Sequence, residues 1–114
     1  MISAFKRRTL GLAAAGLLFG SLATAQPTTI KLMVGFPPGG GTDAIARVLA
    51  DKLKDQLGTP VVVENKAGAG GQIAAQALKA APADGSALCL SHDHTISILP
   101  LVMKNPGFDP AQDF

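Results

Sequence analysis

A repeated unit constrains this chain more than any other feature. A short apolar stretch is followed by a glycine-rich segment and then by an amphipathic stretch, and the order occurs twice. The apolar stretches cover 30–35 and 61–64, and glycine-rich segments 36–43 and 65–72 follow them. Short, almost continuous apolar stretches are typical of strands buried on both faces of a parallel sheet.

A third apolar stretch at 87–90 completes a βαβαβ order and is followed by a polar loop at 91–95. Right-handed crossovers bring the segments that follow parallel strands together at the carboxyl edge of the sheet, where ligands of open α/β sheets bind. Helix starts at this edge offer unpaired N–H groups and the positive end of the helix dipole. Two such starts side by side predict a receptor for a carboxylate or a phosphate.

The helix predicted between the first two strands begins near Thr42 or Asp43, either of which can cap it, and ends at Gly58. Arg47 and Asp51 are four residues apart on one side, a spacing that favours an ion pair. The opposite side carries an apolar stripe, as expected of a face that packs on a sheet, made of Ile45, Val48, Leu49, Leu53 and Leu57. Later in the chain, 96–103 is predicted to be a helix disturbed by Pro100, and 104–114 to be irregular.

Residues 1–25 predict a cleavable secretory signal peptide. Lys6, Arg7 and Arg8 form a basic start, an apolar run covers 10–22, and the small-residue pattern ATA precedes Gln26. The run is shorter than the ~20 apolar residues of a membrane span. Without these residues the chain carries seven basic and eight acidic side chains, a net charge of −1. This balance does not favour a nucleic-acid partner.

The 89 residues that follow the leader contain one cysteine, Cys89, so no internal disulfide can form. A core of this size is marginal without such a staple. We therefore expect residues 26–114 to be the N-terminal part of a longer exported protein.

The first glycine-rich segment permits two interpretations. Gly39, Gly41 and Ala44 match the pattern G-x-G-x-x-A, and Glu64 lies 23 residues after Gly41. This is the fingerprint of a dinucleotide site with its ribose-binding acid, and it predicts an exported α/β enzyme with a nucleotide cofactor bound at 39–44. Three consecutive glycines satisfy many patterns, however, and they leave bare backbone that a ligand can approach closely. We favour direct ligand binding, with Asp43 either turned away as a cap or holding a bridging water.

The polar loop at 91–95 raises the possibility of a metal site, because His92 and His94 follow Cys89. Their spacing does not match the usual zinc patterns, so we predict no metal and no cofactor. Ser91, His92 and Asp93 are contiguous, which is the wrong arrangement for a catalytic triad drawn from separate elements. We expect the imidazoles to hydrogen-bond a ligand or the backbone.

Taken together, these segments resemble the solute-binding receptors of tripartite tricarboxylate transporters, the Bug family. The resemblance covers residues 30–114 and is carried by VGFPPGGGTD at 34–43, PVVVEN at 60–65, GAGG at 68–71, DG at 84–85, FDP at 108–110 and DF at 113–114.

The resemblance implies a periplasmic receptor with two α/β lobes, of which 26–114 would be the N-terminal part of the first, inactive alone. It implies capture of a small carboxylate-bearing solute for the membrane subunits of a transporter, without enzymatic activity. The first two loops would hold the carboxylate through backbone groups and water, and the third would line the cleft. The predicted ligand-binding residues are Phe36, Gly39, Gly40, Gly41, Thr42, Asp43, Ala69, Gly70, Gly71, Gln72, Ser91, His92, His94 and Thr95.

Overall fold

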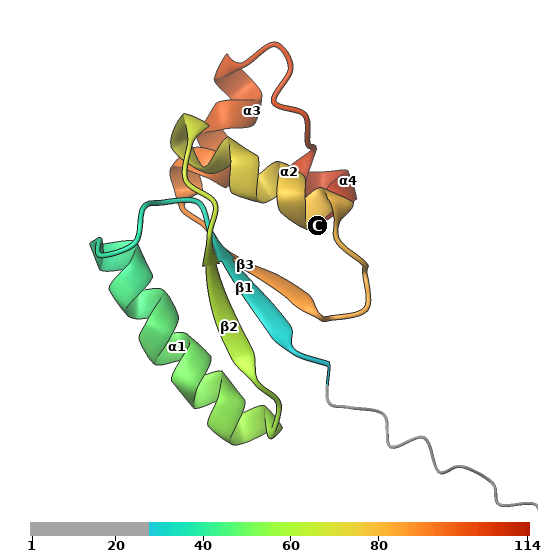
Figure 1. The fold of residues 1–114 in the computed structure, drawn as a ribbon. Helices are drawn as coiled ribbons and strands as arrows, with labels where there is room; N and C mark the ends of the chain where they lie inside the picture. The colour runs from blue at the N-terminus through green and yellow to red at the C-terminus, as the bar shows by residue number, and fades with distance from the viewer. Residues whose placement is uncertain (1–27) are drawn as a thin grey trace, which may run out of the picture.

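Three parallel strands form the centre of the computed structural model, which describes residues 28–114; the predicted signal peptide lies outside the described residues. The strands are β1 (Ile30–Val34), β2 (Val61–Asn65) and β3 (Ala87–Leu90), in the sheet order β2-β1-β3 (Figure 1). The last residue of β1, Val34, pairs with Asn65 and Leu90, the last residues of its two neighbours. All three strands therefore end at one edge of the sheet, which confirms the predicted parallel α/β fold.

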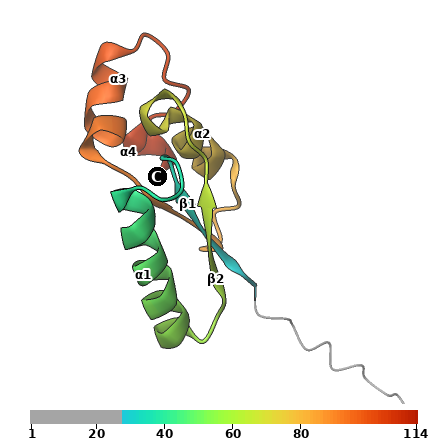
Figure 2. The same ribbon diagram turned by 60° about the vertical axis from the view of Figure 1, so that its left-hand side comes forward.

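Two helices make the crossovers. The longer one, α1 (Gly41–Leu57), joins β1 to β2, and α2 (Gln72–Ala80) joins β2 to β3. Figures 1 and 2 show the helices on opposite faces of the sheet, with α1 over β1 and β2 and α2 over β1 and β3. Within residues 28–114, no helix combines the length and the apolar character needed to cross a bilayer.

The core lies where α1 meets the sheet. Leu32 and Val34 of β1 are buried against Ala46 and Ala50 of α1, whose small side chains let the helix approach the strands closely. Because strand side chains alternate between faces, Met33 points to the opposite side, on which α2 packs. Ala74 and Ala75 are the buried residues of that helix.

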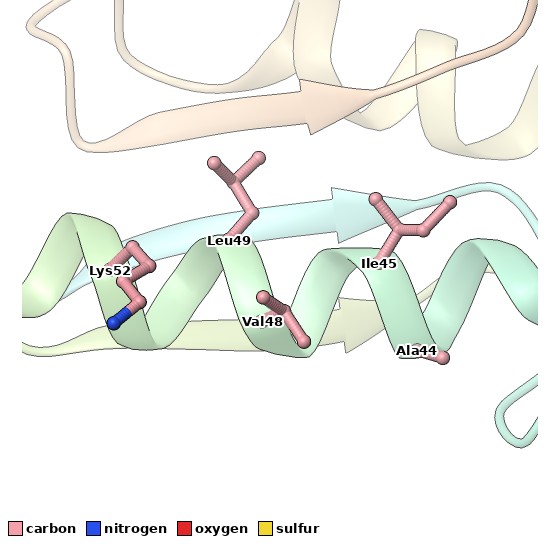
Figure 3. A pocket seen from close by; sticks show the side chains of 5 residues that line it. All are labelled: Ala44, Ile45, Val48, Leu49 and Lys52. Carbon is pink, nitrogen blue, oxygen red and sulfur yellow. The ribbon is translucent and has the colours of Figure 1, made fainter.

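Four of the five residues in the predicted apolar stripe of α1 are exposed, and only Leu53 is half-buried. Ile45 and Val48 are 62% and 64% exposed, and with Leu49 they line a shallow hollow along the helix (Figure 3). The buried side carries Asp43, Ala46 and Ala50 instead. Asp43 is hydrogen-bonded to Gly39 in the loop before the helix and to Asn65 of β2, which is consistent with this side of α1 facing the sheet.

After β3 the chain becomes helical at His94, inside the predicted polar loop. A π-helical turn, η2 (His94–Ile98), continues into the short helix α3 (Leu99–Val102), so the helix expected over 96–103 is shifted and divided. Pro100 lies in the first turn of α3 and, because proline has no N–H group, it donates no hydrogen bond to the carbonyls of the preceding π-helical turn.

The segment 104–114 is not wholly irregular, because it ends in the single turn α4 (Pro110–Asp113). The Asp109 side chain caps this turn by accepting a hydrogen bond from the Ala111 N–H at 2.9 Å. Proline at the first helical position supports the same turn.

Candidate functional site

The first loop connects β1 to α1 and is held in place by the carboxylate of Asp43. This side chain is only 4% exposed. Its Oδ2 atom accepts hydrogen bonds from the Gly39 N–H at 3.0 Å and from Arg47 Nε at 2.8 Å, and its Oδ1 accepts from Arg47 Nη2 at 3.1 Å. Asp43, the third residue of α1, thus reaches back to the backbone of the residue before the N-cap rather than capping the helix itself.

A side chain from β2 completes this arrangement. Asn65 Nδ2 donates to Asp43 Oδ1 at 2.9 Å and to the Phe36 carbonyl at 3.1 Å. Because Asn65 is aligned with Val34 at the end of the neighbouring strand, it lies directly beside the start of the first loop. Asn65 was not among the predicted site residues, although its position directly after the predicted strand at 61–64 places it at the same edge of the sheet as the first loop. The spacing of Arg47 and Asp51 favoured an ion pair, whereas the structure pairs Arg47 with Asp43.

These contacts decide the charge of the site. Hydrogen bonds from the Arg47 guanidinium, then from the Gly39 N–H and then from Asn65 hold the pKa of the Asp43 carboxyl well below its usual range. The residue is therefore ionised, and its negative charge is compensated by the cation it contacts. Repulsion between Asp43 and an anion bound above the loop is correspondingly weakened.

The start of α1 is open. Gly40 is the N-cap residue, and no side chain caps the helix. The first intrahelical bond runs from the Ala44 N–H to the Gly40 carbonyl, so the N–H groups of Gly41 and Thr42 have no helical acceptor. A methyl group added at Gly41 would meet no atom within 4 Å, and one at Gly40 would make only an ordinary contact with the Pro37 carbonyl. Packing does not require glycine at either position.

The second loop is built differently. It contains the turn η1 (Ala69–Gly71), within which the Gly71 N–H donates to the Gly68 carbonyl at 3.0 Å. Gly70 and Gly71 have positive φ angles of 64° and 94°. A methyl group at Gly70 would lie 2.9 Å from His94 Nε2, and one at Gly71 would collide with the Thr95 side chain. Here packing does require glycine.

Buried contacts fix the second loop against its neighbours. The Thr95 hydroxyl, which is fully buried, donates to the Gly70 carbonyl at 2.7 Å. A methyl group added at Gly35, directly after β1, would lie 2.7 Å from the Cα atom of Gly71. The second loop therefore packs backbone to backbone against the start of the first.

The third loop closes the cluster with His92. Its imidazole stacks on Phe36, with ring centroids 4.3 Å apart, and its Nε2 is hydrogen-bonded to Thr42 Oγ1 at 2.9 Å. His94 begins η2, and its backbone N–H donates a hydrogen bond to the Asp93 side chain. The His94 ring lies against Gly70. The three loops thus meet at the carboxyl edge of the sheet.

Most of the predicted site residues lie on the three loops that meet at this edge. Gln72 and Ser91 point elsewhere, since Gln72 Nε2 donates to the Pro106 carbonyl at 2.8 Å and Ser91 borders a separate hollow near Cys89 and Phe114. Thr95 joins the loops through a buried side chain that is engaged within the fold. The others on these loops are Phe36, Gly39, Gly40, Gly41, Thr42, Asp43, Ala69, Gly70, Gly71, His92 and His94.

The geometry does not support the two alternative sites, a metal site and a dinucleotide site. Among residues 28–114 no three His, Cys, Asp or Glu side chains are grouped to hold a metal, and burial raises the pKa of the Cys89 thiol. Glu64, the acid of the dinucleotide fingerprint, is paired with Lys31 at 3.2 Å and with Lys66 at 3.6 Å. The order β2-β1-β3 also differs from the usual dinucleotide-binding order, in which the second strand lies between the first and the third.

Comparison with known sequences gives consistent matches. The sequence profile described as "Tripartite tricarboxylate transporter family receptor" matches residues 45–114. Protein BugT of Bordetella pertussis is 47% identical over 88 residues, which cover 70% of this chain and 27% of BugT. The chain therefore spans about a quarter of the length of this curated relative.

Solved structures share the same arrangement of elements. The periplasmic binding protein BugD superposes with a TM-score of 0.68 and 43% identity, over 72% of this chain and 27% of BugD. MatC from Rhodopseudomonas palustris, solved with bound malate, superposes with a TM-score of 0.71 and 34% identity, over 75% of this chain and 29% of MatC. Both structures are similar to this chain over about a quarter of their own length.

Proposed function

This chain belongs to the tripartite tricarboxylate transporter receptor family, and we propose that it binds a small carboxylate-bearing solute in the periplasm and delivers it to the membrane subunits of a transporter. The proposal assigns binding without chemical conversion. It places residues 28–114 in the first lobe of a two-lobe receptor, behind the signal peptide predicted at 1–25. That MatC was solved with malate supports a carboxylate as the ligand.

The observation that carries the proposal is the open start of α1. Helix N-termini bind anions through free N–H groups and the positive end of the dipole. Here the N–H groups of Gly41 and Thr42 have no helical acceptor, and glycine at positions 40 and 41 is not explained by packing. A carboxylate approaching this backbone therefore meets donors and no side chain that would block it.

Asp43 supports this role from beneath the loop. Its contacts with the Gly39 N–H and Asn65 hold the loop in the conformation that exposes the helix start, while Arg47 compensates its charge. We assign Asp43 a positioning role, with its oxygens turned toward the protein. The second loop packs against Gly35 at the start of the first loop.

The test is calorimetric titration of the protein, purified as the cell makes it, with malate, succinate and adipate, and in parallel with NAD. Saturable binding of a carboxylate and no binding of NAD is the expected result. Binding of NAD without carboxylate binding would favour the nucleotide-dependent enzyme. Mass spectrometry of the periplasmic fraction should show a chain that begins at Gln26, and a chain that retains Met1 would contradict the proposed export.

A further inference from the structure

Asn65 holds the first loop from the neighbouring strand. Its backbone is fixed at the end of β2, where it is aligned with Val34, and the next residue, Lys66, donates its N–H to the Val34 carbonyl at 2.8 Å. The sheet therefore determines where the Asn65 side chain begins. Because the second loop follows β2 in the chain, this side chain connects the start of the second loop to the first loop.

The orientation of the Asn65 amide follows from its two partners. Its Nδ2 atom lies 2.9 Å from Asp43 Oδ1 and 3.1 Å from the carbonyl oxygen of Phe36. An ionised carboxylate and a carbonyl only accept hydrogen bonds, so the amide nitrogen faces them, and its two N–H groups match the two acceptors. Asparagine acts here as a double donor, which neither leucine nor an ionised aspartate can do.

The contacts of Asn65 hold the turn at 36–39 from both ends. Asn65 donates to the Phe36 carbonyl at the start of the turn. Asp43, to which Asn65 also donates, accepts from the Gly39 N–H at the end of the turn. The two residues between these ends are prolines, which have no N–H group to donate. The turn therefore depends on Asn65 and Asp43 for its shape.

We propose that Asn65 is a positioning residue for carboxylate binding, which acts through Asp43 and the Phe36 carbonyl. The inference rests on the proposed carboxylate site at the open start of α1. Asn65 favours the loop conformation in which the N–H groups of Gly41 and Thr42 face the ligand. When its hydrogen bonds are removed, other loop conformations compete, and the apparent affinity falls in proportion to the fraction of molecules that keep the binding conformation.

The first test is Asn65→Leu, which keeps a side chain branched at Cγ but removes both donors. It should bind malate at least about tenfold more weakly than the parent, because a hydrogen bond to a charged group is lost. Calorimetry measures the affinity under conditions in which denaturant titration shows the variant to be folded. If Asn65 served only the stability of the fold, the folded variant would bind like the parent, and this result would overturn the inference.

Asn105 provides a matched control. Its side chain also holds a loop, by accepting a hydrogen bond from the Gly107 N–H at 3.2 Å. Asn105→Ala should bind malate with the affinity of the parent. A loss as large as that of Asn65→Leu would show that the effect is not specific to the first loop and would contradict the positioning role.

Asn65→Asp gives a second readout, which depends on pH. The variant places a second carboxylate beside Asp43, and two carboxylates at this distance share a proton that is retained to higher pH. The shared proton restores a hydrogen bond between positions 65 and 43. The affinity of Asn65→Asp relative to the parent should therefore rise at least about threefold from pH 8 to pH 6, the effect of one hydrogen bond. The relative affinity of Asn65→Leu should stay constant.

The charged and titratable groups around position 65 do not produce this difference. Asp43 and Arg47 face it from α1, and Arg47 stays charged throughout. Its chain neighbours Glu64 and Lys66 pair with each other. His92, stacked on Phe36, is present in every variant and cancels in the relative affinity. A relative affinity of Asn65→Asp that stays constant or falls on acidification would overturn the inference.

The inference and the proposed function fail in different ways. If the parent binds malate and Gly40→Val weakens binding while Asn65→Leu does not, the carboxylate site stands and only the role of Asn65 is wrong. If the parent binds none of malate, succinate and adipate, the proposed function fails and the inference fails with it.

Discussion

The first and second loops have similar glycine-rich sequences but use their glycines for different reasons. In the first loop, a side chain at Gly40 or Gly41 would meet little or nothing. In the second, Gly70 and Gly71 have positive φ angles and lie against His94 and Thr95. Glycine therefore leaves the backbone accessible in the first loop and allows close packing in the second.

The loops also differ in what holds them. A buried carboxylate with charged and polar partners fixes the first loop, whereas backbone contacts and one buried hydroxyl fix the second. The two loops therefore have different roles at the carboxyl edge of the sheet, accessible backbone in the first and close packing in the second. Gly40 and Gly41 of the first loop can change with little effect on stability, while Gly70 and Gly71 of the second cannot.

The largest effect is expected for Gly71→Ala. The new methyl group would collide with Thr95, and alanine is strained at a φ of 94°. Strain at such a φ costs about 1–3 kcal/mol and overpacking a similar amount, so the free energy of unfolding should fall by about 2–6 kcal/mol. Denaturant titration measures this free energy of unfolding. If the variant were as stable as the parent, packing would not require glycine in the second loop and the two loops would not differ in this respect.

The next largest effect is expected for Asp43→Asn, which removes the charge paired with Arg47 but keeps the shape of the side chain. Because folding lowers the pKa of Asp43, its contribution to stability is complete above the unfolded-state pKa of about 3.9 and is lost as the pH falls through the folded value. The parent should be more stable than the variant at pH 6, and the difference should shrink at pH 3. Asp84 and Asp113, whose pKa values are also lowered, are present in both proteins and cancel in this comparison. A difference that grew on acidification would contradict the argument.

Gly40→Val should affect binding rather than folding. Valine fits the extended backbone of Gly40, with φ −83° and ψ 174°, so unfolding should change by no more than about 0.5 kcal/mol. Its branched side chain would cover the N–H groups at the start of α1, and affinity for malate should fall at least about tenfold, or 1.4 kcal/mol. Calorimetry measures the affinity, and an unchanged value would mean that the loop is only a turn.

The smallest effect, and of opposite sign, is expected for Gly41→Ala. The added methyl group meets no atom within 4 Å, and the residue begins a helix without a positive φ. Replacing glycine at a compatible position stabilises a protein by about 0.4–1 kcal/mol, mainly through the unfolded chain. A destabilisation approaching that of Gly71→Ala would show that the two loops are packed alike.

Local sequence patterns were sufficient to predict the order of strands and helices and the edge at which the loops meet. Short β-branched runs such as Val61, Val62 and Val63, bounded by glycine or proline, indicate strands. This signal depends only on residues that are close to one another in the sequence. The family resemblance drawn from the same segments is confirmed by the profile match over 45–114.

What the sequence did not predict depends on contacts between distant residues. The buried side of α1 includes Asp43, which is hydrogen-bonded to Asn65, 22 residues away, and the spacing of Ile45 and Val48 alone could not identify this side. The contact between His92 and Thr42 spans 50 residues. Periodicity describes one element at a time and contains no information about such pairs.

The exposed side of α1 has a practical consequence for handling this polypeptide. Ile45, Val48 and Leu49 form an apolar strip in contact with water in residues 28–114 (Figure 3). Salts such as sulfate are excluded from protein surfaces and strengthen apolar association. On a phenyl column these residues should contribute to a retention of the polypeptide that increases as ammonium sulfate rises.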